Sequence, residues 1–531
     1  MQRWNPRVDT TKQEKLILKR LVRVRALFSF FRLHRHELFD ETFQEKLEAM
    51  YRQTGAGDPP HPPAMLCMVV LLQGYVGASD AEAVELALMD LRWQMVLDCL
   101  GADEPPFSQG ALQAFRERMV AHDLDQLLLE RSAEMVRQGI ASQGDGQMLG
   151  KAVRVAFDSR PLTGAGRVED TINLLGHAAR SIVKLVSKLT QIEPVTLCRQ
   201  AGIPVLLAPS IKAGLDLDWS DPKQKATGIE IVERQVSSLQ RWVDRNLDRF
   251  DSEPLRPYIE ALTVVKRQDL ETKDGRVAIR EGVAPDRRIS IEEAESRHGR
   301  KSRSKRFDGY KEHIGRDLDV PAIVTCAITP ANRPEEEAFE PMVEDLRRQG
   351  LRLAEAHFDR AYLNSPVVPV LQRQKCVIVC KAWGQRARHP HLYSKADFRL
   401  DLRARTITCP AGEVESFEPG ETVHFDPEVC GSCPQRGSCT EAASGRGRSI
   451  SIAADEALQK KLRARQSTRD GREVLRERVA VEHALAHIAA RKGDTARYLG
   501  TRRNLFDLRR AAALQNFEAL QRGEKEAAQA A

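Results

Sequence analysis

Residues 320 to 381 alternate between strand-like and helix-like segments, and this alternation limits the fold more than any other feature of the chain. Strand-like apolar or alternating runs occupy Val320–Thr329, Leu351–Phe358 and Cys376–Lys381. Helix-like segments, Glu335–Gln349 and Pro366–Arg373, lie between them. Strands separated by helices in this way predict an α/β fold built on a sheet.

Two strand-like segments lead into an aspartate. Residues 153–157 alternate with the period of a strand, which we expect to end on Asp158, because proline and glycine follow at 161, 164 and 166. The strand Leu351–Phe358 leads directly into Asp359. A carboxylate at a strand end is well placed to hold a reactive group on a rigid support. The alternative is an aspartate that caps a turn, which is common.

A third carboxylate lies on a predicted helix, Ser467–Ala490. Arg478 and Glu482 are four residues apart and therefore share one helix face, where a surface ion pair is the simpler interpretation. Carboxylate oxygens are suitable ligands for Mg²⁺ or Mn²⁺. Two such ions, held by Asp158, Asp359 and Glu482, would suit phosphoryl transfer.

Basic residues cluster between residues 297 and 306, and the segment leads into Lys311 and His313. Such a run is often only a solvated tail. Here predicted structure flanks it on both sides, so we expect it to contact nucleic-acid phosphates. The expected contacts are Arg297, Arg300, Lys301, Arg303, Lys305, Arg306, Lys311 and His313, although a solvated loop explains Lys311 and His313 equally well.

Four of the ten cysteines gather late in the chain. Cys430 and Cys433 form a CxxC pair, with Cys409 before it and Cys439 after it. Four thiolates with this arrangement can hold Zn²⁺, and a small subdomain with buried thiols is the alternative. The N-terminus has no apolar signal segment and the chain has no long apolar run, so we expect a cytoplasmic protein with reduced cysteines and no membrane contact.

The remaining segments read as helical. A chain of 531 residues with 42% hydrophobic and 30% charged residues is expected to form several globular domains. Helical periodicity predicts a helical N-terminal domain over 1–145 and a helical insertion over about 170–275. The N-terminal helices suit a DNA-reading module or a packing and dimerisation domain. Residues 521–531 are polar and alanine-rich, and we expect a flexible tail there.

Several motifs occur together in one order. They are FDSRPLTGAGRVEDTINLLGHA, SRHGRKSRSKRFDGYKEHI, HFDRAYLNS, the cysteine cluster, RERVAVEHALAHI and RRNLFDLRRAAALQN. Together they resemble a DDE transposase of bacterial insertion sequences. The resemblance covers nearly the whole chain. It implies an RNase H-like catalytic domain over 146–400 and 450–520, interrupted by a Cys-rich, zinc-knuckle-like insertion over 401–449.

The resemblance also implies an activity and its residues. The family cuts DNA at terminal inverted repeats and joins the freed 3′-OH to target DNA, acting as an oligomer. Asp158 and Asp359 match its two aspartates. Glu482 matches its glutamate, because Arg478 precedes it as in the family's Arg-xxx-Glu signature, and this carries Arg478 into the DNA-binding set. Glu477 is the second choice for the third acid.

Three positions depart from the family pattern. Arg160 replaces the threonine of Asp-Ser-Thr, Ala361 replaces a glycine after the second aspartate, and Leu475 replaces a tyrosine before the arginine. None of them removes a carboxylate. Because of these three departures, the alternative to an active transposase is an inactive or domesticated DNA-binding relative, or an RNase H-like nuclease without strand transfer.

Overall fold

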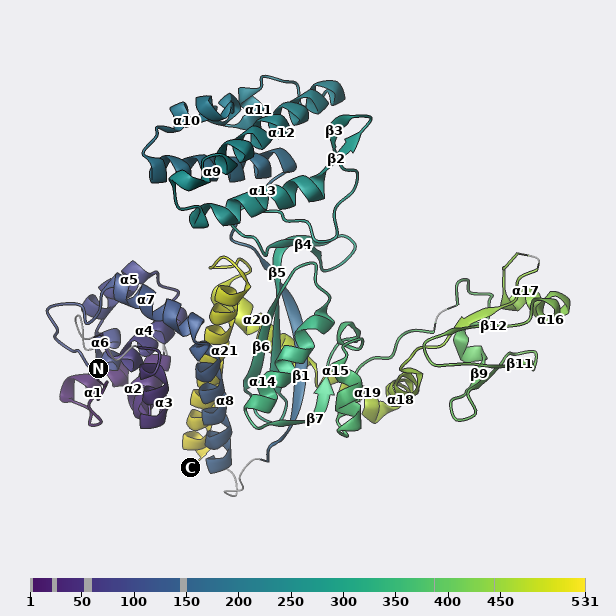
Figure 1. Cartoon of the computed structure of the whole chain (residues 1–531). Coiled ribbons are helices and arrows are strands. Elements are labelled where there is room, and N and C mark those ends of the chain that lie inside the picture. Colours follow the sequence, from purple (N-terminus) through teal and green to yellow (C-terminus); the bar gives the residue numbers. More distant parts are fainter. Residues whose placement is uncertain are drawn as a thin grey trace.

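A six-stranded mixed sheet lies at the centre of the molecule (Figure 1). The computed structural model describes residues 3–21, 26–51, 60–143, 150–385, 387–443 and 445–530. The order is β4-β5-β1-β7-β8, and β6 pairs with β5 on the edge opposite β1. The strands are β1 (Ala152–Thr163), β4 (Arg297–Arg300), β5 (Arg306–Asp317), β6 (Ile323–Pro330), β7 (Arg352–His357) and β8 (Val377–Val379).

Strand direction divides the sheet into two parts. β5 is antiparallel to β1, β4 and β6, whereas β7 is parallel to β1 and β8 is parallel to β7. Helix α14 (Phe339–Arg348) connects β6 to β7, and α15 (Val367–Arg373) connects β7 to β8. The α/β class predicted from the alternating segments is therefore confirmed.

The two faces of β1 pack against different helices. Phe157 meets Phe339 of α14 edge to face, with ring centroids 5.0 Å apart. Ala156, on the other face, belongs to a core with Val481 and Leu485 of α20 (Val479–Lys492) and with α21 (Thr501–Ala530). Because successive strand residues point to opposite faces, Asp158 and Arg160 lie on the α20 side.

Helices α1 to α7 form a group that packs against α8 and α21, the two long helices that run side by side in Figure 1. Residues 144–149, which include the expected domain boundary, lie outside the described residues. The helices are α1 (Lys12–Arg20), α2 (Leu27–Leu38), α3 (Glu41–Glu48), α4 (Pro63–Val76), α5 (Asp80–Met89), α6 (Leu91–Leu97), α7 (Gln109–Ala121) and α8 (Leu124–Gln143).

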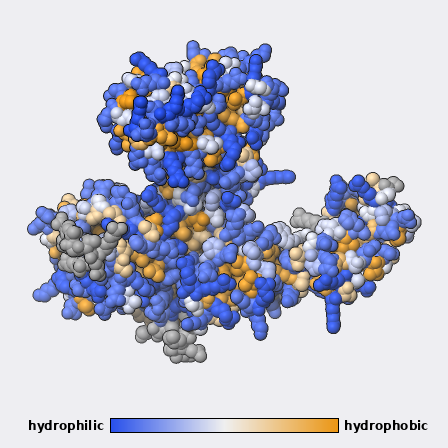
Figure 2. Space-filling view, viewed as in Figure 1, coloured by the Kyte–Doolittle hydropathy of each residue, from blue (hydrophilic) through white to orange (hydrophobic). Residues whose placement is uncertain are grey.

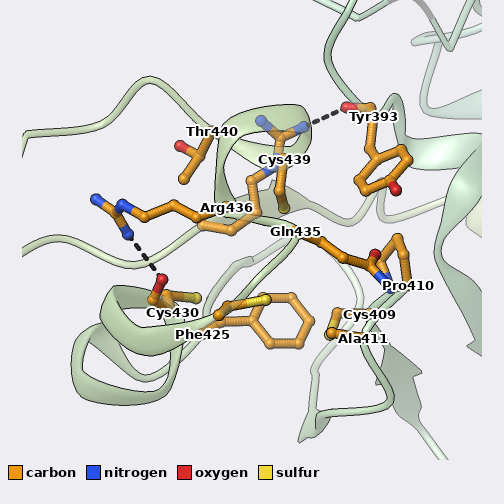
Figure 3. A pocket seen from close by; sticks show the side chains of 12 residues that line it. Tyr393, Cys409, Pro410, Ala411, Phe425, Cys430, Gln435, Arg436, Cys439 and Thr440 are labelled. Atoms are coloured by element: carbon orange, nitrogen blue, oxygen red, sulfur yellow. Dashed lines mark hydrogen bonds between the residues drawn. The ribbon is translucent and has the colours of Figure 1, made fainter.

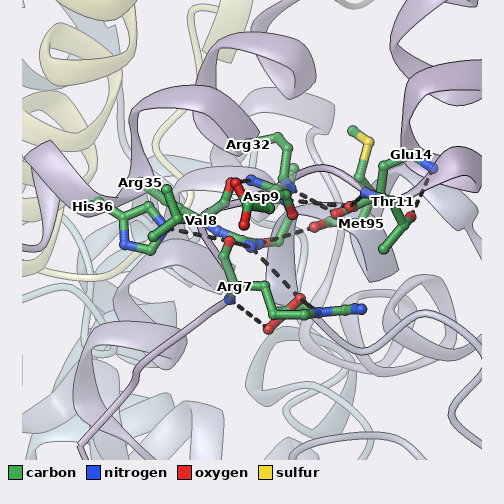
Figure 4. Close-up of polar contacts among 11 residues, drawn as sticks. Arg7, Val8, Asp9, Thr11, Glu14, Arg32, Arg35, His36 and Met95 are labelled. Atoms are coloured by element: carbon green, nitrogen blue, oxygen red, sulfur yellow. Dashed lines mark hydrogen bonds and ion pairs between the residues drawn. The ribbon is translucent and has the colours of Figure 1, made fainter.

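Two buried arginines, Arg32 and Arg35, bind the first residues of the chain to this helical group (Figure 4). Arg32 donates from Nε to Glu14 Oε1 at 2.6 Å. Arg35 donates to the carbonyls of Met95, Val96 and Arg7 at 2.7–3.0 Å. Burial lowers the pKa of Arg35 to about 10, which still leaves the guanidinium charged at neutral pH. A DNA-reading role for these helices stays a prediction.

A helical lobe occupies the expected insertion and has its own hydrophobic core. It appears at the top of Figure 1. Its elements are α9 (Thr171–Thr190), α10 (Pro194–Ala201), α11 (Ile211–Gly214), α12 (Pro222–Asp244), α13 (Arg256–Asp269) and the hairpin of β2 (Leu270–Lys273) with β3 (Arg276–Ile279).

A small β-rich lobe contains the cysteine cluster. Its core includes Phe398 and Ile452, so it extends beyond the expected limits of 401–449. The elements are β9 (Arg399–Asp401), β10 (Thr406–Thr408), β11 (Val414–Ser416), β12 (Thr422–His424), α16 (Pro427–Ser432), α17 (Arg436–Cys439) and β13 (Ser449–Ser451), and the chain returns to the sheet through α18 (Glu456–Ser467) and α19 (Arg469–Arg476).

Two sequence predictions about element ends are wrong. The strand expected to end on Asp158 continues to Thr163, and the tail expected to be flexible is helical through Ala530. Alanine-rich sequence favours a helix, and Gln521 additionally donates from its side chain to the carbonyl of Ala26 at 2.5 Å. The tail therefore continues α21, and its first residues contact α2, where Glu524 lies 3.3 Å from His34, while residues 525–529 are exposed.

The described surface is mostly hydrophilic with scattered apolar patches on the face shown in Figure 2. Among the described residues no single helix is both long and apolar enough to cross a membrane. Only α4 and α5 taken together, with a bend of 102° between them, pass by length and composition.

Candidate active site

Asp158 lies in the middle of β1, although Pro161 follows it. β7 pairs with β1 only as far as Ala156, so the rest of β1 has no strand partner on that side. Proline is tolerated at such an edge because its missing N–H breaks no ladder hydrogen bond. The strand thus extends past Asp158, and it carries Arg160 on the same face.

Asp359 follows β7, the parallel neighbour of β1. Ala156 is the register partner of His357, so continuing both chains by two residues brings Asp158 and Asp359 to the same level. The Asp359 carboxylate accepts a hydrogen bond from the Arg360 N–H at 2.6 Å and caps the 3₁₀ turn Arg360–Tyr362. Ala361 lies within that turn and is not among the residues with positive φ, so replacing the family's glycine introduces no backbone strain there.

Glu482 lies in the first turn of α20, over the same face of the sheet. The predicted single helix Ser467–Ala490 is divided, because α19 ends at Arg476 and α20 begins at Val479. This break directs Arg478 toward the sheet. Its Nη1 lies 3.1 Å from Asp158 Oδ2, and its Nη2 lies 2.5 Å from Glu482 Oε1. The predicted ion pair between Arg478 and Glu482 is confirmed, and Arg478 also forms an ion pair with Asp158.

Glu477, the second choice for the third acid, points elsewhere. It forms an ion pair with Arg154, which also pairs with Asp319 and Glu355. Asp158, Asp359 and Glu482, in contrast, line one pocket of about 870 Å³. The geometry therefore favours Glu482 over Glu477.

The pocket changes the acidity of its deepest carboxylate. Burial raises the pKa of Asp158, and the guanidinium of Arg478 opposes that increase. Glu482 adds to the increase because it places a second negative charge nearby. A cation held among these carboxylates would relieve the same repulsion.

The described residues contain no group of three or more His, Cys, Asp or Glu side chains placed to hold a metal ion. The donor chemistry of Asp158, Asp359 and Glu482 nevertheless fits a hard divalent cation, since three carboxylates line one pocket. Arg478 lies between two of them and supplies the positive charge there.

The basic segment is a hairpin at the rim of this pocket. β4 pairs with the start of β5, and Lys301, Lys305 and Arg306 line the pocket together with the three acids. Arg300 and Arg303 are exposed on the same hairpin. Arg297 differs, because it forms an ion pair with Asp286 at 2.8 Å. The hairpin thus brings most of the predicted phosphate contacts close to the carboxylates.

Two predicted DNA contacts, His313 and Lys311, are bonded within the protein, and His313 lies fully inside it. His313 is fully buried, with Nδ1 2.8 Å from Tyr362 Oη and Nε2 2.9 Å from Thr329 Oγ1. Burial lowers the pKa of His313 to about 3, so the ring is neutral, and the predicted DNA contact is wrong. Lys311 is half-buried and donates to the carbonyl of Arg333 at 2.8 Å. Both residues lie within β5, and His313 is buried because residues 312–315 of this strand are covered on both faces.

The four clustered cysteines line one small pocket of the β-rich lobe (Figure 3). Burial raises the pKa of Cys439, Arg448 opposes the increase, and the other three thiols add to it. Cys409 also accepts a hydrogen bond from the N–H of Glu413 at 3.3 Å. Cys409 follows β10, Cys430 and Cys433 lie in and at the end of α16, and Cys439 ends α17. Four soft sulfur donors around one cavity fit the chemistry of a zinc site.

No local sequence pattern indicates the role of Arg160, which differs from the family pattern but has no predicted partner. The structure buries it beside Glu312, and it reaches the end of α20. Alternation along β1 could have placed it on the Asp158 face, but its partners are distant in sequence.

Two segments of the chain match families of known proteins. Residues 408–521 match the family described as Transposase DDE domain, and residues 27–118 match the one described as Transposase domain (DUF772). The first segment includes Glu482, and the second covers most of the N-terminal helices. No curated protein and no solved structure matches the chain. The two matches are consistent with a DDE transposase of the insertion-sequence type, so the resemblance predicted from the motifs is confirmed.

Proposed function

We propose that this chain is a DNA transposase that binds the terminal inverted repeats of an insertion sequence and catalyses metal-dependent strand cleavage and strand transfer. The observation that carries the proposal is one pocket that joins three carboxylates, from β1, β7 and α20, to a basic hairpin. Acids at the reacting phosphate and cations along the backbone are the two requirements of this chemistry.

The order of the strands supports an RNase H-like catalytic domain. Three antiparallel strands, β6, β5 and β1, continue into two parallel ones, β7 and β8, and helices connect the parallel part. In this arrangement Asp158 and Asp359 come from neighbouring strands, and α20 brings Glu482 across the same face.

Asp158, Asp359 and Glu482 would hold the divalent ions. When bound, two Mg²⁺ or Mn²⁺ ions would stabilise the attacking and leaving oxygens of an in-line phosphoryl transfer. The chain's own contribution is to place three carboxylates on rigid elements and to keep Asp158 partly shielded from water. Arg478 pairs with two of these acids and lines the pocket, so it would meet the DNA backbone there rather than on an outer surface.

The proposal is tested with duplex DNA that carries the inverted repeats flanking this gene, in Mg²⁺ or Mn²⁺. We expect nicking at the repeat ends and joining of the 3′ ends to target DNA, both absent when EDTA replaces the metal. Tight binding without nicking under either metal would support an inactive DNA-binding relative. Nicking of duplexes that lack the repeats, without joining, would support a nuclease. Paired-end synapsis would require an oligomer, and the mass of the protein–DNA complex tests that expectation.

Reversing two charges on the hairpin should weaken the salt dependence of DNA binding. For Lys301→Glu combined with Lys305→Glu, the slope of log K against log salt should fall by about 2, because each lost phosphate contact removes about 0.9. Fluorescence anisotropy over a salt series measures this slope. The matched control reverses Arg347 and Arg352, two exposed arginines away from the pocket, and should leave the slope unchanged. An unaltered slope in the hairpin variant would mean that these lysines face solvent.

Zinc in the β-rich lobe is part of the same proposal. We expect the purified protein to carry about one Zn²⁺ per chain, held by Cys409, Cys430, Cys433 and Cys439, in the four-coordinate manner of structural sites. Elemental analysis should find the zinc lost from a Cys430→Ser, Cys433→Ser variant and kept in Cys99→Ser, a half-buried cysteine outside the cluster. A zinc-free wild-type protein would mean that the cluster is a set of four half-buried thiols without a metal.

A further inference from the structure

We infer that Arg160 is a positioning residue that fixes helix α20, and with it Glu482, against the strand that carries Asp158. The inference rests on the proposed function for its catalytic consequence. The structural part, in which one side chain ties the two elements together, stands on the contacts alone.

Arg160 reaches three acceptors on two elements. Its Nε donates to Glu312 Oε2 at 2.5 Å on the neighbouring strand β5, where Glu312 is also its register partner. Its Nη1 donates to Asp494 Oδ1 and its Nη2 to the carbonyl of Gly493, each at 2.8 Å. Gly493 is the C-cap of α20, so the guanidinium meets a free carbonyl at the negative end of the helix dipole.

A second cation from α20 completes the connection. Lys492, the last residue of α20, pairs with the other oxygen of Glu312 and lies 3.2 Å from Asp507 Oδ2 on α21. Glu312 is fully buried and therefore holds one cation from β1 and one from α20. We call Arg160, Glu312 and Lys492 the α20 clamp.

The backbone beyond the helix follows β1 as well. The Thr163 N–H donates to the carbonyl of Asp494 at 2.8 Å, and the Ala496 N–H donates to the carbonyl of Thr163 at 2.7 Å. The C-terminal end of α20 is thus attached to β1 through side chains and main chain. Its N-terminal end meets β1 through the ion pair of Arg478 with Asp158 and through Val481 and Leu485, which share a core with Ala156. Arg478 must also face the pocket.

The two ends of α20 therefore differ: the clamp holds the C-terminal end, and the N-terminal end carries Glu482 into the pocket. Arg160 and Glu312 are buried, the side chain of Lys492 is nearly so, and Nε, Nη1 and Nη2 of Arg160 all have acceptors. We therefore expect the clamp to set the direction of α20. Glu482 lies between two and three turns from Lys492 along the helix. A small tilt at the clamp is therefore amplified at Glu482, and catalysis is sensitive to displacements of about 1 Å.

The test compares Arg160→Gln, Arg160→Lys and a control, Arg137→Gln, in the full chain. Arg137 forms a similarly sheltered ion pair at 2.7 Å with Asp317, at the other end of β5, and makes no contact with α20. Three quantities are measured: the single-turnover rate of repeat-end cleavage, the Kd for repeat DNA, and amide hydrogen exchange at Thr163, Ala496 and along α20.

For Arg160→Gln we expect the cleavage rate to fall about 100-fold, as for a misplacement of about 1 Å, with Kd changed by less than about twofold. Exchange at Thr163 and Ala496 should accelerate, because their hydrogen bonds join the two elements. Arg160→Lys keeps the charge and the contact with Glu312, so it should recover part of both effects. Arg137→Gln should change neither the rate nor the exchange at these two amides.

The outcomes separate the two proposals. A folded Arg160→Gln protein with wild-type cleavage and wild-type exchange would overturn the positioning role and leave the transposase proposal intact. An equal loss of rate in Arg137→Gln would also overturn it, because any buried ion pair would then have the same effect. If wild-type protein cleaves no repeat DNA, the proposed function fails, and the exchange measurement still decides whether Arg160 fixes α20.

Discussion

Asp158→Asn is expected to lower strand cleavage by at least about 1,000-fold, the factor that corresponds to a loss of ~4 kcal/mol of transition-state stabilisation. The amide keeps the shape of the side chain but removes the charge that a divalent cation requires. Binding of repeat DNA should persist, because the hairpin cations are unaffected. The repeat-end nicking assay in Mg²⁺ measures the loss.

Asp308→Asn is the matched control for that prediction. Asp308 lines the same pocket but pairs with His298 at 2.6 Å and lies on the hairpin side, away from the three acids. Its amide variant should cleave within a few-fold of wild type. Cleavage that is retained by Asp158→Asn, or lost equally in both variants, would contradict the assignment of the three carboxylates to the catalytic site.

Glu312→Gln should destabilise the sheet by ~3–5 kcal/mol, the cost of leaving buried charges without their partner. Glu312 is fully buried and pairs with both Arg160 and Lys492, so its loss leaves each of these sheltered cations with one carboxylate, Asp494 for Arg160 and Asp507 for Lys492. The chain contains several separate cores, so native-state hydrogen exchange of β5 and α20 is the suitable measurement, since it reports opening free energies region by region.

An exposed ion pair provides the comparison for Glu312. Glu344 pairs with Arg347 at 3.3 Å on the surface of α14, and both side chains are about half exposed. Glu344→Gln should therefore cost no more than ~1 kcal/mol. A similarly small cost for Glu312→Gln would show that the α20 clamp does not stabilise the fold.

Local patterns predicted the sheet and the position of the acids well. Apolar runs separated by helices define β6, β7 and β8, and the two aspartates meet because they follow or lie within neighbouring parallel strands. The end of β1 was mispredicted because Pro161 normally breaks a strand. Whether a strand edge is free, as it is beside Pro161, depends on the length of β7 and cannot be read from local sequence.

The polar connections could not be predicted for a different reason. Arg160 and Gly493 are distant in sequence and meet only after α20 has packed against β1. His313 resembled part of a basic surface, because it follows the cationic run, yet its place in β5 turns it inward. Arg478 was expected to contact DNA from a surface position, and instead it bridges two of the acids.

The central claim is that Asp158, Asp359 and Glu482 act together at one metal-dependent site. The most direct measurement compares Glu482→Gln with Glu477→Gln in the repeat-end cleavage assay with Mg²⁺. The two glutamates are close in sequence, but only Glu482 lines the pocket, while Glu477 pairs with Arg154. We predict that Glu482→Gln abolishes nicking and that Glu477→Gln keeps it. Nicking that survives in Glu482→Gln, or disappears only in Glu477→Gln, would contradict the account.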